Sequence, residues 1–325
     1  MKIKIEELKK TCLGILADSG LSNDDAQLVF DEYLDAELRG RKCHGFAAFK
    51  QFGAKLSKAE GEPKVIKEDD NLLFIDGQKN LGQIVCHEFV PKLIEKAKKK
   101  SIAIMGIKNM HSYLMPGTFA RMAAEKEIVS LIFNYGGASR VCPEGSIDPV
   151  FATNPIAIGI PSEELPIVVD MATSKTSMMN VRLAEKLGLN IGPDLAIDKN
   201  GNPTVDPKEA MEGALLPFGD YKGAALALAI EVLTKTMFGI GSKEDGRGFL
   251  FIFIDPSVFQ DIDKFKKDVS FLIQKIKNSR KENGVDEIFF PGEHSERTKE
   301  ENMKKDYLEL DERIINEINL LKTEI

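Results

Sequence analysis

The strongest indication of the fold is the segment TNPIAIGIPSEELPIVVDMATS, residues 153–174. Two apolar runs, Ile156–Ile160 and Pro166–Asp170, flank a short polar turn at Ser162-Glu163-Glu164. Apolar runs joined by such a turn are typical of an antiparallel β-hairpin. The middle of the chain therefore predicts an antiparallel sheet rather than a doubly wound parallel one.

Further strands and helices surround this hairpin. Short apolar runs predict strands at Leu72–Asp76, Ile102–Ile107, Ile128–Asn134 and Phe249–Ile254. Helical spacing of apolar residues predicts helices around residues 90–97, 119–126 and 224–233. We expect these elements to form one central sheet domain over residues 71–257.

Both ends of the chain have helical patterns. Ile5, Leu8, Cys12 and Ile15 recur at helical spacing, and Ser22 can cap a second helix. Two amphipathic helices are expected near the other end, at residues 265–276 and 307–321. The sequence thus predicts an α/β protein in which residues 1–70 and 258–325 build a helical domain beside the antiparallel-rich sheet domain.

Bulk composition excludes several classes of partner. The chain has 325 residues, is 43% hydrophobic and has a formal net charge of −7. A mildly acidic protein is not expected to bind nucleic acid or an anionic membrane as its main partner. There is no apolar run of about 18 residues and no signal-peptide pattern. The four cysteines are widely spaced, which favours reduced thiols and a cytoplasmic location.

Common catalytic motifs are absent from the sequence. It contains no GxGxxG after a strand, no Walker loop, no HExxH and no GxSxG. The histidines His44, His87, His111 and His294 lack metal-ligand spacing, so no metal site is expected. These absences argue against a Rossmann fold, a kinase, a zinc enzyme and a serine hydrolase.

Five motifs, in this order and spacing, carry a family resemblance. They are Leu38-Arg39-Gly40 with Cys43-His44-Gly45, Thr153-Asn154-Pro155-Ile156-Ala157, Asp170-Met171-Ala172-Thr173-Ser174, Asp198-Lys199-Asn200-Gly201-Asn202-Pro203-Thr204 with Asp206-Pro207, and Leu216-Pro217-Phe218-Gly219 with Lys222-Gly223. Together they resemble the non-Rossmann malate/L-lactate dehydrogenase family, which includes sulfolactate dehydrogenases and cyclic-imine reductases. The archaeal malate/sulfolactate enzymes look most similar, from about Ile5 to Phe290-Pro291-Gly292.

The resemblance implies a fold, a cofactor and an assembly. Family members have an antiparallel-rich sheet domain that binds NAD or NADP, a helical part from both termini, and a homodimeric or higher assembly. It places Asp170, Met171, Ala172 and Lys222 along the cofactor, with Tyr135 as a further candidate. A lysine in a Gly-flanked loop can approach a phosphate as a point charge. The alternative is structural: Asp170 ends a strand and Lys222 caps the following helix.

The family's reaction transfers a hydride between nicotinamide and C2 of a small 2-hydroxy or 2-oxo acid, or a related imine. Such a site needs a proton donor or acceptor, for which histidine suits neutral pH, and a cation for the substrate carboxylate. His44 matches the family's motif histidine and is the first candidate, with Asp170 as its carboxylate partner. The alternative is an ordinary histidine at the end of the second helix.

The sequence departs from the family at these positions. Ala48 stands where the family has the arginine that binds the substrate carboxylate, which leaves Arg41 and Arg140 as candidate anchors. A second family histidine aligns with Ser112, while His111 lies one residue early. One residue on a helix means about 100° of rotation, so His111 can replace it only if the backbone shifts. We keep both His111 and Ser112 as candidate catalytic residues.

Three functions remain open from the sequence. The first is an NAD(P)-dependent oxidoreductase with a small-molecule substrate. The second is a non-catalytic paralogue that keeps the fold and the dimer, which the loss of the family residues at Ala48 and Ser112 favours. The third is an unrelated α/β binding protein.

Overall fold

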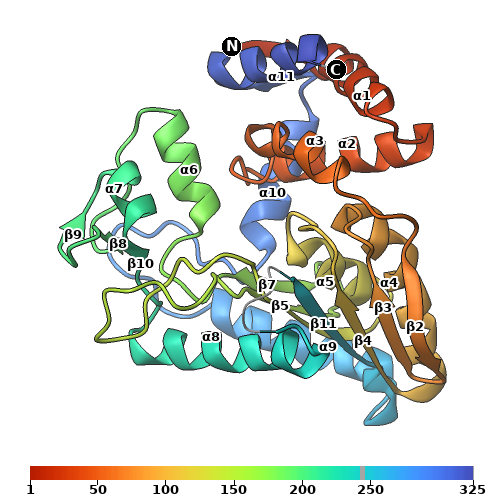
Figure 1. The fold of residues 1–325 in the computed structure, drawn as a ribbon. Helices are drawn as coiled ribbons and strands as arrows, with labels where there is room; N and C mark the ends of the chain where they lie inside the picture. The colour runs from red at the N-terminus through yellow and green to blue at the C-terminus, as the bar shows by residue number, and fades with distance from the viewer. Residues whose placement is uncertain (242–245, 325) are drawn as a thin grey trace.

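A seven-stranded mixed sheet forms the centre of the molecule in the computed structural model, which describes residues 1–241 and 246–324 (Figure 1). The strand order is β2-β3-β4-β11-β5-β6-β7, and β3 with β4 is the parallel pair among otherwise antiparallel neighbours. The strands are β2 (Lys64–Asp69), β3 (Leu72–Asp76), β4 (Ile102–Lys108), β5 (Val129–Asn134), β6 (Ile156–Ile160), β7 (Ile167–Met171) and β11 (Gly248–Ile254). The predicted α/β class is confirmed.

The predicted hairpin is β6–β7, paired from Ile156↔Met171 to Ile160↔Ile167. Its register is fixed because alternate residues of each strand face the helices that cover the sheet. This pairing brings Asp170 to the same end of the sheet as Asn134, the last residue of β5. The hairpin therefore carries Asp170 to the sheet edge where the candidate site lies.

Helices cover both faces of the sheet. Phe249, Phe251 and Phe253 alternate along β11 into a core shared with α4 and α5, while α8 packs against β5 and β11. The run Phe249–Ile254 is continuously apolar because the central strand is covered on both sides. The covering helices are α4 (Gly82–Lys100), α5 (Pro116–Glu125) and α8 (Tyr221–Thr234), followed by the short η2 (Thr236–Phe238).

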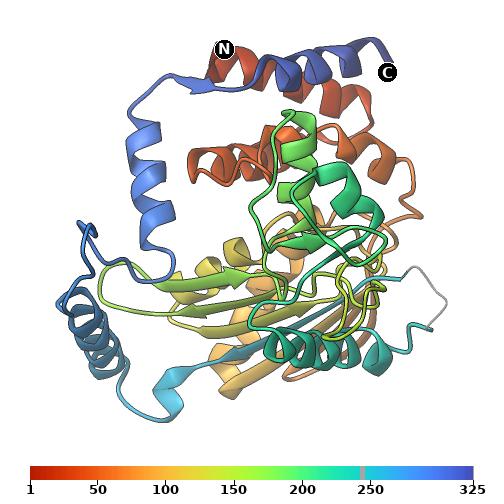
Figure 2. The same ribbon diagram turned by 90° about the vertical axis from the view of Figure 1, so that its left-hand side faces the viewer.

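A helical cap made from both ends of the chain lies on one side of the sheet (Figure 2). Ser22 accepts a hydrogen bond from the Asp25 N–H at 3.1 Å, which confirms the expected N-cap. The cap shares one apolar core. Its elements are β1 (Lys2–Lys4), α1 (Ile5–Asp18), α2 (Asn23–Leu38), η1 (Phe46–Ala48), α3 (Gln51–Leu56), β12 (Tyr307–Glu309) and α11 (Glu312–Glu324).

The helix predicted over residues 307–321 is wrong at its start. Tyr307–Glu309 is strand β12, which pairs with β1 from Lys4↔Tyr307 to Lys2↔Glu309, and α11 begins only at Glu312. The pairing satisfies backbone groups between segments that are far apart in sequence, so local periodicity does not indicate it. Helix α10 (Glu293–Met303) was also not predicted, since its sequence is almost wholly polar.

A smaller unit stands beside the cap. It packs α6 (Met178–Lys186) and α7 (Pro207–Glu212) against a three-stranded sheet in the order β10-β8-β9. Its strands are β8 (Ala196–Ile197), β9 (Pro203–Thr204) and β10 (Ala214–Leu215). Strands of two residues are too short for a periodic signal, which is why the sequence does not predict them.

Two elements bear on the division into domains. Strand β2 precedes residue 71 but pairs with β3, and α9 (Ile262–Lys277), which follows η3 (Pro256–Val258), packs near the β6–β7 hairpin. We therefore propose a division in which β2 and α9 belong to the sheet domain. None of the helices in the described part of the chain is long and apolar enough to cross a membrane.

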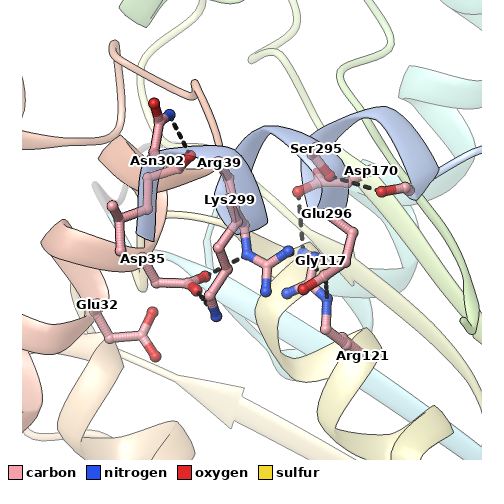
Figure 3. Close-up of polar contacts among 12 residues, drawn as sticks. Glu32, Asp35, Arg39, Gly117, Arg121, Asp170, Ser295, Glu296, Lys299 and Asn302 are labelled. Carbon is pink, nitrogen blue, oxygen red and sulfur yellow. Dashed lines mark hydrogen bonds and ion pairs between the residues drawn. The ribbon is translucent and has the colours of Figure 1, made fainter. Parts of the chain in front are cut away.

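A charged bridge ties the cap to the sheet domain through α10 (Figure 3). Arg39, which follows α2, donates to Asp35 at 2.6 Å and pairs with Glu296 of α10. Lys299 of α10 pairs with Asp35 at 2.7 Å, and Arg121 of α5 lies 3.6 Å from Glu296. The Arg39 side chain is only 4% exposed, so these contacts hold a buried cation between three helices.

Candidate active site

A cavity of about 710 Å³ is lined by residues from the cap, from α6 and from the sheet edge. His44, Ser112, Asp170, Met171, Ala172, Arg41 and Arg140 all line it. Seven of the ten residues predicted to form the site, from segments distant in sequence, thus meet in one place. A volume of this size is within the range of small-molecule and cofactor sites.

His44 lies in the turn between α2 and η1. Its Nδ1 lies 3.1 Å from the Cys43 Sγ, which leaves Nε2 as the ring nitrogen available to a ligand. Burial, helped by the charge of Arg41, lowers the pKa of His44 to about 4. The imidazole is therefore neutral at pH 7 and can accept a proton.

Glu37 lies directly beneath this turn and is 7% exposed. Its Oε2 accepts a hydrogen bond from the Phe46 N–H at 3.1 Å, and the turn passes so close that Gly45 leaves no room for a side chain. Burial raises the pKa of Glu37 to about 7, although the Phe46 N–H and Lys42 act against the shift. The carboxyl group thus holds the turn that presents His44, and the sequence analysis did not identify it.

Asp170 ends in the cavity at the start of α5. Its Oδ2 accepts a hydrogen bond from the Gly117 N–H at 3.0 Å (Figure 3). Burial raises the pKa of Asp170, while the Gly117 N–H, Arg41 and Arg121 oppose the rise. Among the described residues, no hydrogen bond joins Asp170 directly to His44.

Ser112 and His111 take different places. Ser112 lines the cavity, and its Oγ accepts from the Leu114 N–H at 3.3 Å. His111 does not line the cavity; its Nε2 is buried without a hydrogen-bond partner in the described structure. Burial, with Arg247 and Lys55, lowers the pKa of His111 to about 4. Of the two candidates, Ser112 lines the cavity and His111 does not.

Two predicted cofactor residues lie outside the cavity lining. Lys222 is exposed in the first turn of α8. Tyr135 is buried, and its hydroxyl accepts a hydrogen bond from Lys235 Nζ at 3.3 Å. Both positions can reach only a ligand that extends beyond this cavity. No group of three or more His, Cys, Asp or Glu side chains in residues 1–241 and 246–324 is arranged to hold a metal ion.

Besides Arg41 and Arg140, five cations line the cavity that the sequence analysis did not identify as site residues, Lys42, Lys55, Lys175, Arg182 and Arg247. Lys55 of α3, Arg182 of α6 and Arg247 beside β11 line the cavity and are called the cationic cluster below. Lys55 had a weak signal, because His44, Ala48, Gln51 and Lys55 recur at helical spacing and share the cavity wall. Arg182 and Arg247 had none, since only the tertiary fold brings them together.

The sequence places the chain among known proteins. Residues 3–319 match the malate/L-lactate dehydrogenase family. The chain belongs to this family. The malate/(S)-sulfolactate dehydrogenase of Methanothermus fervidus is 34% identical to it over 340 residues, which cover 100% of this chain and 98% of that protein. The family member described here therefore has full-length relatives that are oxidoreductases.

Two other relatives extend this picture. The solved structure of sulfolactate dehydrogenase from Methanocaldococcus jannaschii has a TM-score of 0.87 and 31% identity, covering 100% of this chain and 97% of that one. The Δ1-pyrroline-2-carboxylate reductase 1 of Burkholderia ambifaria is 29% identical over 274 residues, or 79% of this chain and 80% of that protein. Relatives thus include both hydroxy-acid dehydrogenases and an imine reductase. The structural match confirms the non-Rossmann fold that the resemblance implied.

Proposed function

We propose that this member of the malate/L-lactate dehydrogenase family is an NAD(P)-dependent oxidoreductase that interconverts a small 2-hydroxy acid and the matching 2-oxo acid. The observation that carries the proposal is the convergence of His44, Ser112 and Asp170 on one cation-lined cavity. Hydroxy acids are anions, and a cavity with several arginines and lysines suits them. The family supplies the class of reaction.

A nicotinamide dinucleotide fits the chemistry of this cavity. Asp170, Met171 and Ala172 follow one edge of it, and its basic side chains suit the negative charge of a pyrophosphate. The bound cofactor would supply the hydride acceptor or donor. The residues of this chain would bind and orient the reactants and transfer the proton.

His44 is the proposed proton carrier. Its lowered pKa keeps Nε2 unprotonated at neutral pH, so the ring accepts the proton of the substrate hydroxyl as the hydride leaves C2. In the reverse direction the same nitrogen returns a proton to the oxygen of the 2-oxo acid. Ser112 can hydrogen-bond to that oxygen from the position that a histidine occupies in relatives.

The test is a rate measurement on a substrate panel. The purified protein is assayed with NADH and NADPH against oxaloacetate, pyruvate, sulfopyruvate and a cyclic imine. We expect turnover of at least one acid, and we expect His44→Ala to lose about 10²–10⁴ in rate without a change in melting temperature. His111→Ala is the matched control and should keep most of the activity. An equal loss of activity in both variants would contradict the assignment to His44, and a loss in His111→Ala alone would assign proton transfer to His111.

A non-catalytic paralogue is the second candidate, because Ala48 and Ser112 replace family site residues. It predicts a different result from the same samples. NADH or NADPH would raise the melting temperature by binding the native state, yet none of the panel would be turned over.

We also propose a homodimer and a cytoplasmic location. Helix α8 is apolar on all sides, and its Leu228 and Val232 are 54% and 48% exposed. Helices that are apolar all round are normally buried, so a second copy is the expected cover. Light scattering at micromolar concentration should give twice the mass of the chain.

The four cysteines are free and buried, in keeping with a reducing compartment.

A further inference from the structure

The cationic cluster joins three separate parts of the fold at one end of the cavity. Lys55 comes from α3, Arg182 from α6, and Arg247 from the residue before β11. The Arg247 guanidinium lies against the backbone of Gly137, because a side-chain carbon added there would meet its Nε at 3.3 Å. Arg140, from the same loop as Gly137, adds a fourth positive charge nearby.

These cations repel one another, and the described residues provide no acidic side chain that pairs with them. Burial, then Arg247 and Arg182, lowers the pKa of Lys55 to about 8, and burial with Arg182 lowers the pKa of Arg247. Within residues 1–241 and 246–324, none of the three cluster residues forms an ion pair. Lys55 and Arg247 are half-buried, while Arg182 is exposed. Unpaired charge on the two half-buried residues is costly, and a bound anion would relieve that cost.

Asp170 is the one acidic residue among those described that lines the cavity, and it lies too far from the cluster to be its counter-charge. Asp170 is on β7, three strands from the β11 edge that carries Arg247, or about 14 Å at the usual strand spacing. The charges that influence Asp170 are those of Arg41 and Arg121, not those of the cluster. The cavity therefore has a balanced end at Asp170 and an unbalanced positive end at the cluster.

The unbalanced end lies beside the proposed reaction centre. His111, the neighbour of Ser112, is influenced by both Arg247 and Lys55, so the cluster is close to this segment. Lys55 shares the cavity wall of His44, and the small side chain of Ala48 lies between them in sequence. An anionic group held at the cluster is thus on the substrate side of the cavity.

We infer that Lys55, Arg182 and Arg247 bind a distal anionic group of the substrate, a carboxylate or sulfonate, in addition to the carboxylate next to C2. The inference rests on the proposed function and narrows its substrate to dianionic 2-hydroxy and 2-oxo acids. The cluster then provides positive charge in the cavity, whereas Ala48, at the position of the family's arginine, provides none. A monoanionic acid or an uncharged imine would leave the cluster unpaired.

The test compares two substrates in matched variants. Lys55→Met and Arg182→Met remove one charge each and keep most of the side-chain length, and Lys50→Met removes an exposed charge that does not line the cavity. KM is measured for oxaloacetate and for pyruvate, and Kd for NADH and NADPH. Each cluster variant should raise KM for oxaloacetate at least about tenfold, while KM for pyruvate, both cofactor Kd values and the Lys50→Met enzyme change by less than about threefold.

Other outcomes overturn the assignment. If both acids lose affinity equally, the cluster does not hold a distal group. If Kd for NADPH or NADH rises and the preference between the acids is kept, the bound anion is a cofactor phosphate.

A binding measurement separates this inference from the proposed function. Succinate should raise the melting temperature more than acetate at equal ionic strength, and both cluster variants should lose that difference. If the wild-type enzyme turns over none of the panel, but succinate stabilises it more than acetate does and the cluster variants lose that difference, the proposed reaction is refuted and the anion site is retained. No difference between succinate and acetate in wild-type protein would refute the anion site itself.

Discussion

At the scale of single residues, the site region contains a buried carboxyl group, Glu37, and a half-buried one, Asp170, with different surroundings. Asp170 has Arg41 and Arg121 near it and an N–H donor from Gly117. Glu37 has one N–H donor and the more distant charge of Lys42. Burial raises the pKa of Glu37 to about 7, so below neutral pH its carboxyl group supports the His44 turn in the protonated, neutral form.

Glu37→Gln tests this protonation state. Glu37 keeps its proton in the folded protein up to pH about 7, whereas the unfolded chain releases it near pH 4.5. Its contribution to folding is therefore present below pH 4.5 and is lost as the pH rises to 7. The free energy of unfolding of Glu37→Gln minus that of wild type should therefore be greater at pH 8 than at pH 4.5, by on the order of 3 kcal/mol.

Urea unfolding at a series of pH values measures this difference. The control is Glu95→Gln, an exposed position on α4, which should follow the wild-type profile. A Glu37→Gln profile parallel to that of wild type between pH 4.5 and 8 would contradict the raised pKa.

At the scale of elements, the start of α5 and the end of β7 fit together through one glycine. A side-chain carbon on Gly117 would lie 2.6 Å from Asp170 Oδ2 and 3.0 Å from its Cβ. Both elements are held by the core, since Phe119 of α5 and Val168 of β7 are buried in it. The close approach lets the helix N-terminus donate to the carboxylate.

Gly117→Ala should therefore displace Asp170. We expect a fall in turnover and in cofactor affinity of about tenfold or more, because contacts at a reacting centre are sensitive to shifts of about 1 Å. Gly14→Ala on α1 is the control, since a side chain there meets nothing within 4 Å and alanine favours a helix. Unchanged cofactor affinity in the Gly117 variant would show that Asp170 does not contact the cofactor.

Prediction from the sequence succeeded where the signal was local or where family motifs carried it. The β6–β7 hairpin, the central strands and the Ser22 cap follow from neighbouring residues. The motifs pointed to His44 and Asp170, which line one cavity and whose roles stay a prediction. The sequence could not indicate β12, whose partner lies about three hundred residues away, or the meeting of Arg182 with Arg247. Such contacts depend on tertiary packing and leave no periodic trace.

At the scale of the whole molecule, the charged bridge formed by Asp35, Arg39, Arg121, Glu296 and Lys299 joins cap and sheet domain. Four of its members come from the cap or α10, and Arg121 comes from α5. Since Arg121 also influences Asp170, the bridge extends to the proposed site. The relative position of the two halves thus affects the shape of the cavity between them.

Arg39→Met should destabilise this connection strongly. Removing one partner of a buried ion pair costs about 3–5 kcal/mol. We expect the lower end of that range here, because Lys299 still pairs with Asp35 and Arg121 still lies near Glu296. The control is Arg313→Met, which breaks an exposed pair with Asp311 and should cost less than about 1 kcal/mol. Denaturant unfolding measures both variants. Equal losses would mean that the bridge adds nothing beyond a surface ion pair.

The pairing of β1 with β12 has a consequence for synthesis on the ribosome. The apolar face of α1, with Leu8, Cys12 and Ile15, is completed by Ile314 and Ile318 of α11. During translation the apolar face of α1 therefore stays uncovered by α11 until residues 307–321 have left the exit tunnel. Segments that wait this long for their partner are prone to association with one another. Production of this protein should accordingly depend on chaperones that shield the emerging N-terminal helices during translation.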